Sequence, residues 1–154
     1  MRPLRLFATT LAIGLLFSIT QAQEKKIKLS QLPPAVEKAV AKETEGATIK
    51  GFATEIEHGQ KFYEAELLVN GHTKDLLFDK NGNIVEVEEQ VDLDSLPAAV
   101  QDALKSAAGS GKIEAVESLT KNRQLVAYEA HVKTGAKRSE IKVGPNGERL
   151  KKPE

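Results

Sequence analysis

The three histidines, His58, His72 and His131, are the best candidates in this sequence for metal ligands or general bases. None lies four residues from another, so the H-x-x-x-H and H-E-x-x-H spacings that bring two imidazoles together on a helix are absent. The chain has no cysteine, which excludes a thiol nucleophile and a thiolate-bound metal. The sequence therefore predicts no metal site and no cofactor, with the histidines in turns or on the surface. A site assembled from residues far apart in the sequence stays open.

Glu64 and Glu66 project from one face of the alternating segment 62–69, and Glu129 repeats Glu64 in a similar later segment. Two carboxylates on one face can hydrolyse glycosides, but a proton-donating carboxyl group needs apolar surroundings to raise its pKa. The neighbouring positions on this face are polar, so we interpret these residues as solvated surface charge. Glu129 shares its face with His131, but no serine is placed beside them to act as a nucleophile. We therefore predict no catalytic residue and no enzyme activity.

The segments that carry these side chains belong to an internal sequence repeat. Three short motifs recur in the same order, 64 or 65 residues apart. They are L-P at Leu32 and Leu96, Y-E-A at Tyr63 and Tyr128, and N-G at Asn81 and Asn146. Such a series predicts two tandem repeats, 23–91 and 92–154, joined by an acidic linker over 86–94.

Each repeat begins with apolar residues at helical spacing and continues with alternating strands and glycine turns. Tyr63 and Tyr128 fall on the apolar strand face, which predicts that they pack in the core. Alternation breaks between Ile49 and Phe52, which favours a β-bulge near Gly51. The predicted fold is α+β, with two tandem repeats, each one helix packed on a roughly four-stranded antiparallel sheet.

The first 22 residues have the three-part pattern of a secretory signal. Arg2 and Arg5 precede an apolar stretch over 6–19, and Thr20-Gln21-Ala22 supplies small residues for cleavage after Ala22. The stretch is shorter than the roughly 20 apolar residues that span a bilayer. We expect a signal peptide at 1–22, a periplasmic or extracellular protein, and no membrane span after cleavage.

The formal net charge of the chain is +0, which removes the general electrostatic case for nucleic-acid binding. The charge is nevertheless unevenly divided. Residues 23–91 hold thirteen acidic and nine basic groups, whereas 92–154 hold nine acidic and eleven basic groups. The first repeat is therefore the acidic one.

The repeated motif L-P-x-x-V-x-x-A, followed by Y-E-A and an N-G turn behind a secretory signal, resembles the PepSY-like family, also described as β-lactamase-inhibitor-like proteins. The resemblance covers about residues 27–152. It implies an exported, non-enzymatic tandem of small α+β repeats, with relatives that inhibit hydrolases as protease propeptide segments or β-lactamase inhibitors. It supplies no catalytic residue to carry over.

The leading hypothesis is a binding module that presents the polar sheet face to a protein partner, with an envelope hydrolase or peptidase as the class of partner. Its candidate contact residues are Glu64, Glu66, Leu68, Glu129, His131 and Lys133. Leu68 is an apolar side chain on an otherwise polar face, as contact surfaces often show. The alternative is a small-molecule or ion-binding envelope protein with a pocket between helices and sheet.

Overall fold

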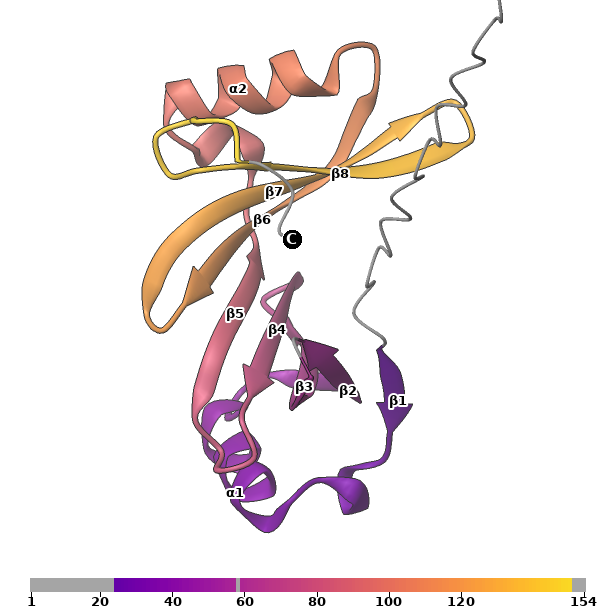
Figure 1. The fold of residues 1–154 in the computed structure, drawn as a ribbon, viewed down its shortest axis with the longest axis vertical. Helices are drawn as coiled ribbons and strands as arrows, with labels where there is room; N and C mark the ends of the chain where they lie inside the picture. Colours follow the sequence, from indigo (N-terminus) through magenta and orange to yellow (C-terminus); the bar gives the residue numbers. More distant parts are fainter. Residues whose placement is uncertain (1–23, 58, 151–154) are drawn as a thin grey trace, which may run out of the picture.

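The structure is a computed structural model that describes residues 24–57 and 59–150 (Figure 1). The predicted signal peptide, residues 1–22, and His58 lie outside the described residues. The described part contains two α-helices and eight strands. They are β1 (Lys25–Ile27), α1 (Pro34–Glu43), β2 (Thr48–Glu57), β3 (Gln60–Val69), β4 (His72–Phe78), β5 (Ile84–Gln90), α2 (Ala98–Ala108), β6 (Lys112–Lys121), β7 (Gln124–Thr134) and β8 (Lys137–Val143).

The eight strands form one antiparallel sheet in which each strand pairs with its neighbour in the chain, from β1 to β8. The predicted α+β class with antiparallel strands is therefore confirmed. The sheet continues through the middle of the chain because β5 pairs with β6, from Glu86↔Lys121 to Gln90↔Glu117. The prediction of an acidic linker over 86–94 is wrong for its first part, since residues 86–90 lie in a central strand of the sheet.

The strand count differs between the two halves. Four strands follow α1, and three, β6, β7 and β8, follow α2 in the described residues. All of them lie in one continuous sheet, so the predicted arrangement of one four-stranded sheet for each helix is not confirmed. A single bridge between Val143 and Arg149 stands in place of a fourth strand. The short β1, which precedes α1 and pairs with β2, has too few residues to show an alternating pattern.

Both helices lie on the same face of the sheet. Cross-strand pairing places Leu67, Lys74, Glu89, Ser118, Tyr128 and Val143 in one continuous row. Leu67 belongs to the core beneath α1, whereas Tyr128 and Val143 belong to the core beneath α2. The two helices stand at opposite ends of the molecule (Figure 1), so one sheet face carries two separate cores.

Each core is built from the apolar face of one helix. Val36 and Val40 of α1 pack with Leu67, Leu76 and Phe78. In the other half, the corresponding helix residues are Val100 and Leu104, which pack with Val116, Ala130 and Val132. Tyr63 and Tyr128 pack against the respective cores, which confirms their predicted inward direction.

Two features predicted from local sequence are also present. The register shifts between Ile49 and Gly51 confirm the predicted β-bulge, and a second shift lies between Ile113 and Ala115. The Asn70-Gly71 turn between β3 and β4 has positive φ at both residues, 52° and 89°. Such backbone angles are those of the tight hairpin turn that the N-G pair favours.

Candidate interaction surface

The sheet face turned away from α1 and α2, called the open face below, carries the candidate contact residues. Side chains alternate between faces along each strand, so the rows next to the helix-side row belong to the open face. One such row runs through Glu66, Asp75, Glu88, Leu119 and Ala127. The next row on the same face contains Gln90, Glu117, Glu129 and Lys142.

Four apolar residues form a buried layer within the open face. Ala53, Leu77, Leu119 and Ala127 are exposed by 0%, 7%, 6% and 2%, respectively. None of them belongs to either helix-side core. The register places Ala53 and Leu77 on either side of Glu64, and Leu119 next to Glu88. The acidic side chains of this face therefore stand beside apolar groups rather than only beside water.

Burial among these groups raises the pKa of three carboxyl groups on β3, β4 and β5. The pKa of Glu64 rises to about 7, that of Asp75 to about 6 and that of Glu88 to about 8. Desolvation is the largest cause in each case, and repulsion by neighbouring carboxylates adds to it. The interpretation of this face as solvated charge is wrong, because the leucines that desolvate it come from neighbouring strands.

Few cations balance these carboxylates. Lys26 Nζ lies 3.5 Å from Glu66 Oε1, and Lys121 Nζ lies 2.7 Å from Glu86 Oε2. Within residues 24–57 and 59–150, the ion pairs include none to Glu64, Asp75 or Glu88. The Glu66 carboxylate lies over the backbone of Gly51, where a Cβ would be 3.3 Å from Oε1. Its buried Oε1 has no hydrogen-bond partner among the described residues.

On the β7–β8 side of the open face, Glu129 and Glu117 have basic side chains as partners. Glu129 is 7% exposed, and its Oε2 lies 2.5 Å from Lys142 Nζ. Burial raises the pKa of Glu129, and the hydrogen bond to Lys142 works in the opposite direction. His131 Nε2 lies 3.0 Å from Glu117 Oε2. Burial alone would lower the pKa of His131, but the hydrogen bond and the charge of Glu117 outweigh it and raise the pKa.

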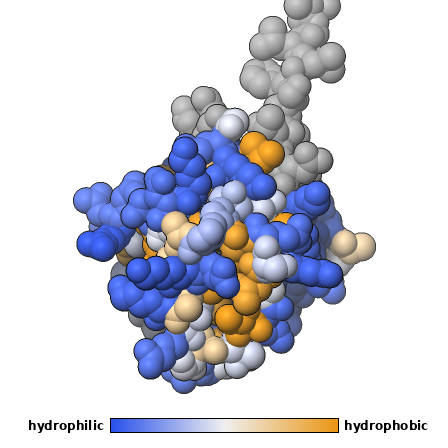
Figure 2. All heavy atoms as spheres, turned by 90° about the horizontal axis from the view of Figure 1, so that it is seen from below, coloured by the Kyte–Doolittle hydropathy of each residue, from blue (hydrophilic) through white to orange (hydrophobic). Residues whose placement is uncertain are grey.

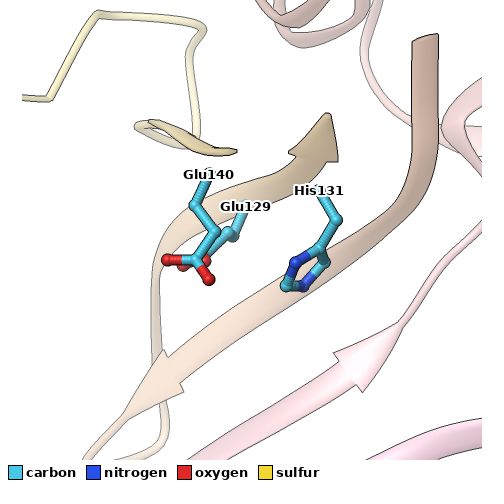
Figure 3. A group of neighbouring side chains, drawn as sticks. All are labelled: Glu129, His131 and Glu140. Atoms are coloured by element: carbon cyan, nitrogen blue, oxygen red, sulfur yellow. The ribbon is translucent and has the colours of Figure 1, made fainter. Parts of the chain in front are cut away.

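Glu140 is a neighbour of this group that sequence reasoning missed. It lies on β8 directly opposite His131 on β7. Ligand atoms of Glu129, His131 and Glu140 all lie within 4.8 Å of one another (Figure 3). Neither spacing nor motif indicates this proximity, because it depends on the register of two strands joined by a turn.

The six predicted contact residues share the open face but do not form one cluster. Glu64, Glu66 and Leu68 stand on β3, whereas Glu129, His131 and Lys133 stand on β7. Strands β4, β5 and β6 separate the two groups. Leu68 is half-buried and pairs with Thr73, and Lys133 is exposed near the end of its strand. Their role in partner contact stays a prediction.

The molecular surface is not uniformly polar. Seen from the α1 end, charged and polar residues cover most of the surface, and apolar residues gather in a central strip (Figure 2). Neither α1 nor α2, the two α-helices of the described residues, has the length and hydropathy of a membrane-spanning helix.

A family model described as "Putative beta-lactamase-inhibitor-like, PepSY-like" matches residues 18–85 and again 61–151. The chain belongs to this PepSY-like family. The two overlapping matches together include all of the described residues, so the family assignment concerns both halves of the sheet. No curated protein matches the chain.

Solved structures from Bacteroides species have a similar fold. One, described as "putative periplasmic", comes from Bacteroides eggerthii and is 22% identical, with a TM-score of 0.64 over 78% of this chain and 86% of the other. A DUF2874 family protein from Bacteroides ovatus is 23% identical, with a TM-score of 0.60 over 78% and 85%. A BLIP-like protein from Bacteroides fragilis is 25% identical, with a TM-score of 0.54 over 76% and 82%.

Proposed function

We propose that this PepSY-like chain is a non-enzymatic binding module of the bacterial envelope that receives a protein partner on the open face of its sheet. The observation that carries the proposal is the set of carboxyl groups of Glu64, Asp75 and Glu88, which lie beside buried leucine and alanine and lack an ion-pair partner in the described chain. The name of the BLIP-like relative supports a binding role of this kind.

These carboxyl groups favour a partner with a basic contact surface. In the free protein, burial removes part of the hydration of each carboxyl group. Ionisation near other carboxylates adds a Coulomb cost. A lysine or arginine side chain of a partner would supply the missing positive charge and hydrogen-bond donors. Charge complementarity of this type sets specificity and association rate more than affinity.

The partner class that we propose is an envelope hydrolase or peptidase, which the module would inhibit. This follows from the inhibitor-like description of the family and from the predicted signal peptide at 1–22 with cleavage after Ala22. The proposal includes the duplication of the chain into repeats 23–91 and 92–154. Two separate helix-side cores on one sheet support that duplication.

The alternative of a pocket between helices and sheet has no observation in its favour. Val36 of α1 and Val100 and Leu104 of α2 are each 0% exposed and fill this space in the two halves. Ligand binding is therefore better sought on the open face.

Affinity capture from envelope extract of the native organism, with residues 23–154 as bait, tests the proposal. The open-face variant Asp75→Lys/Glu88→Lys reverses two charges, and the control Glu37→Lys/Glu45→Lys reverses two exposed charges at α1 and the turn after it. We expect one envelope protein to be recovered with wild type and control, and at least tenfold less with the open-face variant, by quantitative mass spectrometry. The recovered protein should lose hydrolytic activity when wild type is added. Equal recovery with both variants would reject the open face as the contact surface.

A further inference from the structure

Glu129, His131 and Glu140 bring two carboxylates and one imidazole together at one point of the open face. Glu129 and His131 are two residues apart on β7 and so point to the same side, and Glu140 faces them from β8. Their ligand atoms lie within 4.8 Å of one another. A single ion bonded to each at about 2.0–2.2 Å would need only small side-chain rotations to reach all three.

A fourth residue orients the imidazole. Glu117 on β6 accepts a hydrogen bond from His131 Nε2 at 3.0 Å when that nitrogen carries the proton. The neutral ring then has its lone pair on Nδ1, and the ring turns a nitrogen toward the carboxylates of Glu129 and Glu140 (Figure 3). A carboxylate that holds the second nitrogen of a metal-binding histidine fixes both tautomer and ring direction. In that tautomer, the orientation of His131 leaves Nδ1 free to bind a metal.

The local charge suits a divalent cation. Glu117, Glu129 and Glu140 surround the imidazole of His131, and Lys142 is the cation that pairs with Glu129. This arrangement leaves an excess of two negative charges when all three carboxyl groups are ionised and the imidazole is neutral. Lys142 contacts Oε2 of Glu129, so the other carboxylate oxygen can bind a metal. The Glu129 side chain is only 9% exposed, and a buried carboxylate is oriented more firmly than a solvated one.

We propose that Glu129, His131 and Glu140 form a zinc-binding site, with Glu117 as a positioning residue. An imidazole nitrogen with two carboxylates suits zinc, whereas calcium is bound by oxygen ligands alone, usually six to eight of them. Three protein ligands leave the fourth tetrahedral position to water or to a side chain of a bound protein. This site goes beyond the proposed function, because partner binding to the acidic strands β3, β4 and β5 does not require it.

Isothermal titration calorimetry of residues 23–154 without an affinity tag tests the site, with ZnCl₂ and CaCl₂ as separate titrants. We expect one zinc per chain and no calcium binding at this point. His131→Ala and Glu140→Gln should each weaken zinc binding at least tenfold. His72→Ala is the matched control, since His72 hydrogen-bonds to the Gln90 carbonyl at 3.2 Å on another part of the sheet, and it should leave the affinity unchanged.

Glu140 is exposed, so its substitution should preserve the fold even where loss of His131 disturbs β7, and circular dichroism checks both variants. Absence of zinc binding to the wild type would overturn the proposal. So would equal affinity in wild type and Glu140→Gln, or an equal loss in His72→Ala and His131→Ala. None of these three results would affect the capture experiment on the acidic strands.

Discussion

Gly82, in the turn between β4 and β5, lies directly against the backbone carbonyl of Ala35 in α1. A Cβ on Gly82 would be 2.5 Å from that oxygen. Gly147 has the same relationship to Ala99 in α2, again with 2.5 Å to the carbonyl oxygen. Both glycines have positive φ, 81° and 83°. Each turn therefore contacts a helix backbone at a point where only glycine fits.

This contact predicts that Gly82→Ala and Gly147→Ala each lower the free energy of unfolding by roughly 2–4 kcal/mol, because a clash with backbone adds to left-handed strain. Urea denaturation measures the change. Gly46→Ala is the control: its φ is 81°, but a Cβ there meets nothing within 4 Å, so it should cost only about 1 kcal/mol. Equal losses at Gly46 and Gly82 would contradict a steric contact with the helix.

The raised pKa of Glu88 predicts a protein that loses stability between pH 4.5 and pH 8. Burial, followed by repulsion from Glu86, raises the pKa of Glu88 from 4.5 to about 8 in the folded chain. The folded state therefore holds the proton more tightly than the unfolded state. This contribution is complete below pH 4.5 and is lost as the pH rises through 8. Glu88→Gln cannot ionise, so its stability should fall less over this range, by on the order of 3 kcal/mol.

Chemical denaturation at pH 5 and pH 8 checks this prediction. Glu89→Gln is the matched control on the same strand, because Glu89 points to the opposite face and its side chain is 45% exposed beside Lys74. A pH profile that is the same for Glu88→Gln and wild type would show that the Glu88 carboxyl group is solvated.

The ion pair between Lys142 and Glu129 should stabilise the β7–β8 hairpin. Lys142→Met leaves a carboxylate that is 9% exposed without its cation, and we expect a loss of about 3 kcal/mol. Adding Glu129→Gln to this variant should restore most of that loss, because no buried charge remains. Lys42→Met removes an exposed pair with Glu43, in which the lysine side chain is 83% exposed, and should change stability by less than about 0.5 kcal/mol. Thermal unfolding separates these cases.

The turn between β6 and β7 offers a stabilising substitution. Asn122 and Arg123 both have positive φ, 49° and 66°, in a two-residue hairpin loop that favours Asn-Gly. Arg123→Gly should raise the free energy of unfolding by roughly 0.5–1 kcal/mol, because glycine relieves the left-handed strain of the larger residue. The reverse substitution Gly71→Arg, in the Asn70-Gly71 turn between β3 and β4, which also has positive φ at both residues, should lower the free energy of unfolding. A lower melting temperature for Arg123→Gly would contradict this account.

Local sequence patterns were sufficient for the features that depend on neighbouring residues in the chain. Alternation identified the inward tyrosines Tyr63 and Tyr128, and the broken alternation at Ile49 located the bulge at Gly51. These features follow from the two-residue period of a strand. They need no knowledge of which strands are neighbours in space.

The pairing of strands decided the properties of the candidate site. Residues 86–90 look like an acidic linker by composition, but pairing on both sides makes them a central strand. Once β3, β4, β5 and β6 are adjacent, Leu77 stands beside Glu64 and Leu119 beside Glu88. Burial in this sheet raises the pKa of both carboxyl groups. Composition determines how many charges a segment carries, whereas their hydration depends on side chains of other strands.

The amino-acid sequence alone determined the α+β class, the repeated motifs and the side of the sheet on which Glu64, Glu129 and His131 lie. The tertiary structure alone decided that Glu140 faces His131 and that the open face is partly desolvated. The physical reason is that the pKa and hydration of a side chain depend on neighbouring strands, which lie about 4.8 Å away in space. Residues on those strands can be far apart in the sequence, so local patterns do not identify them.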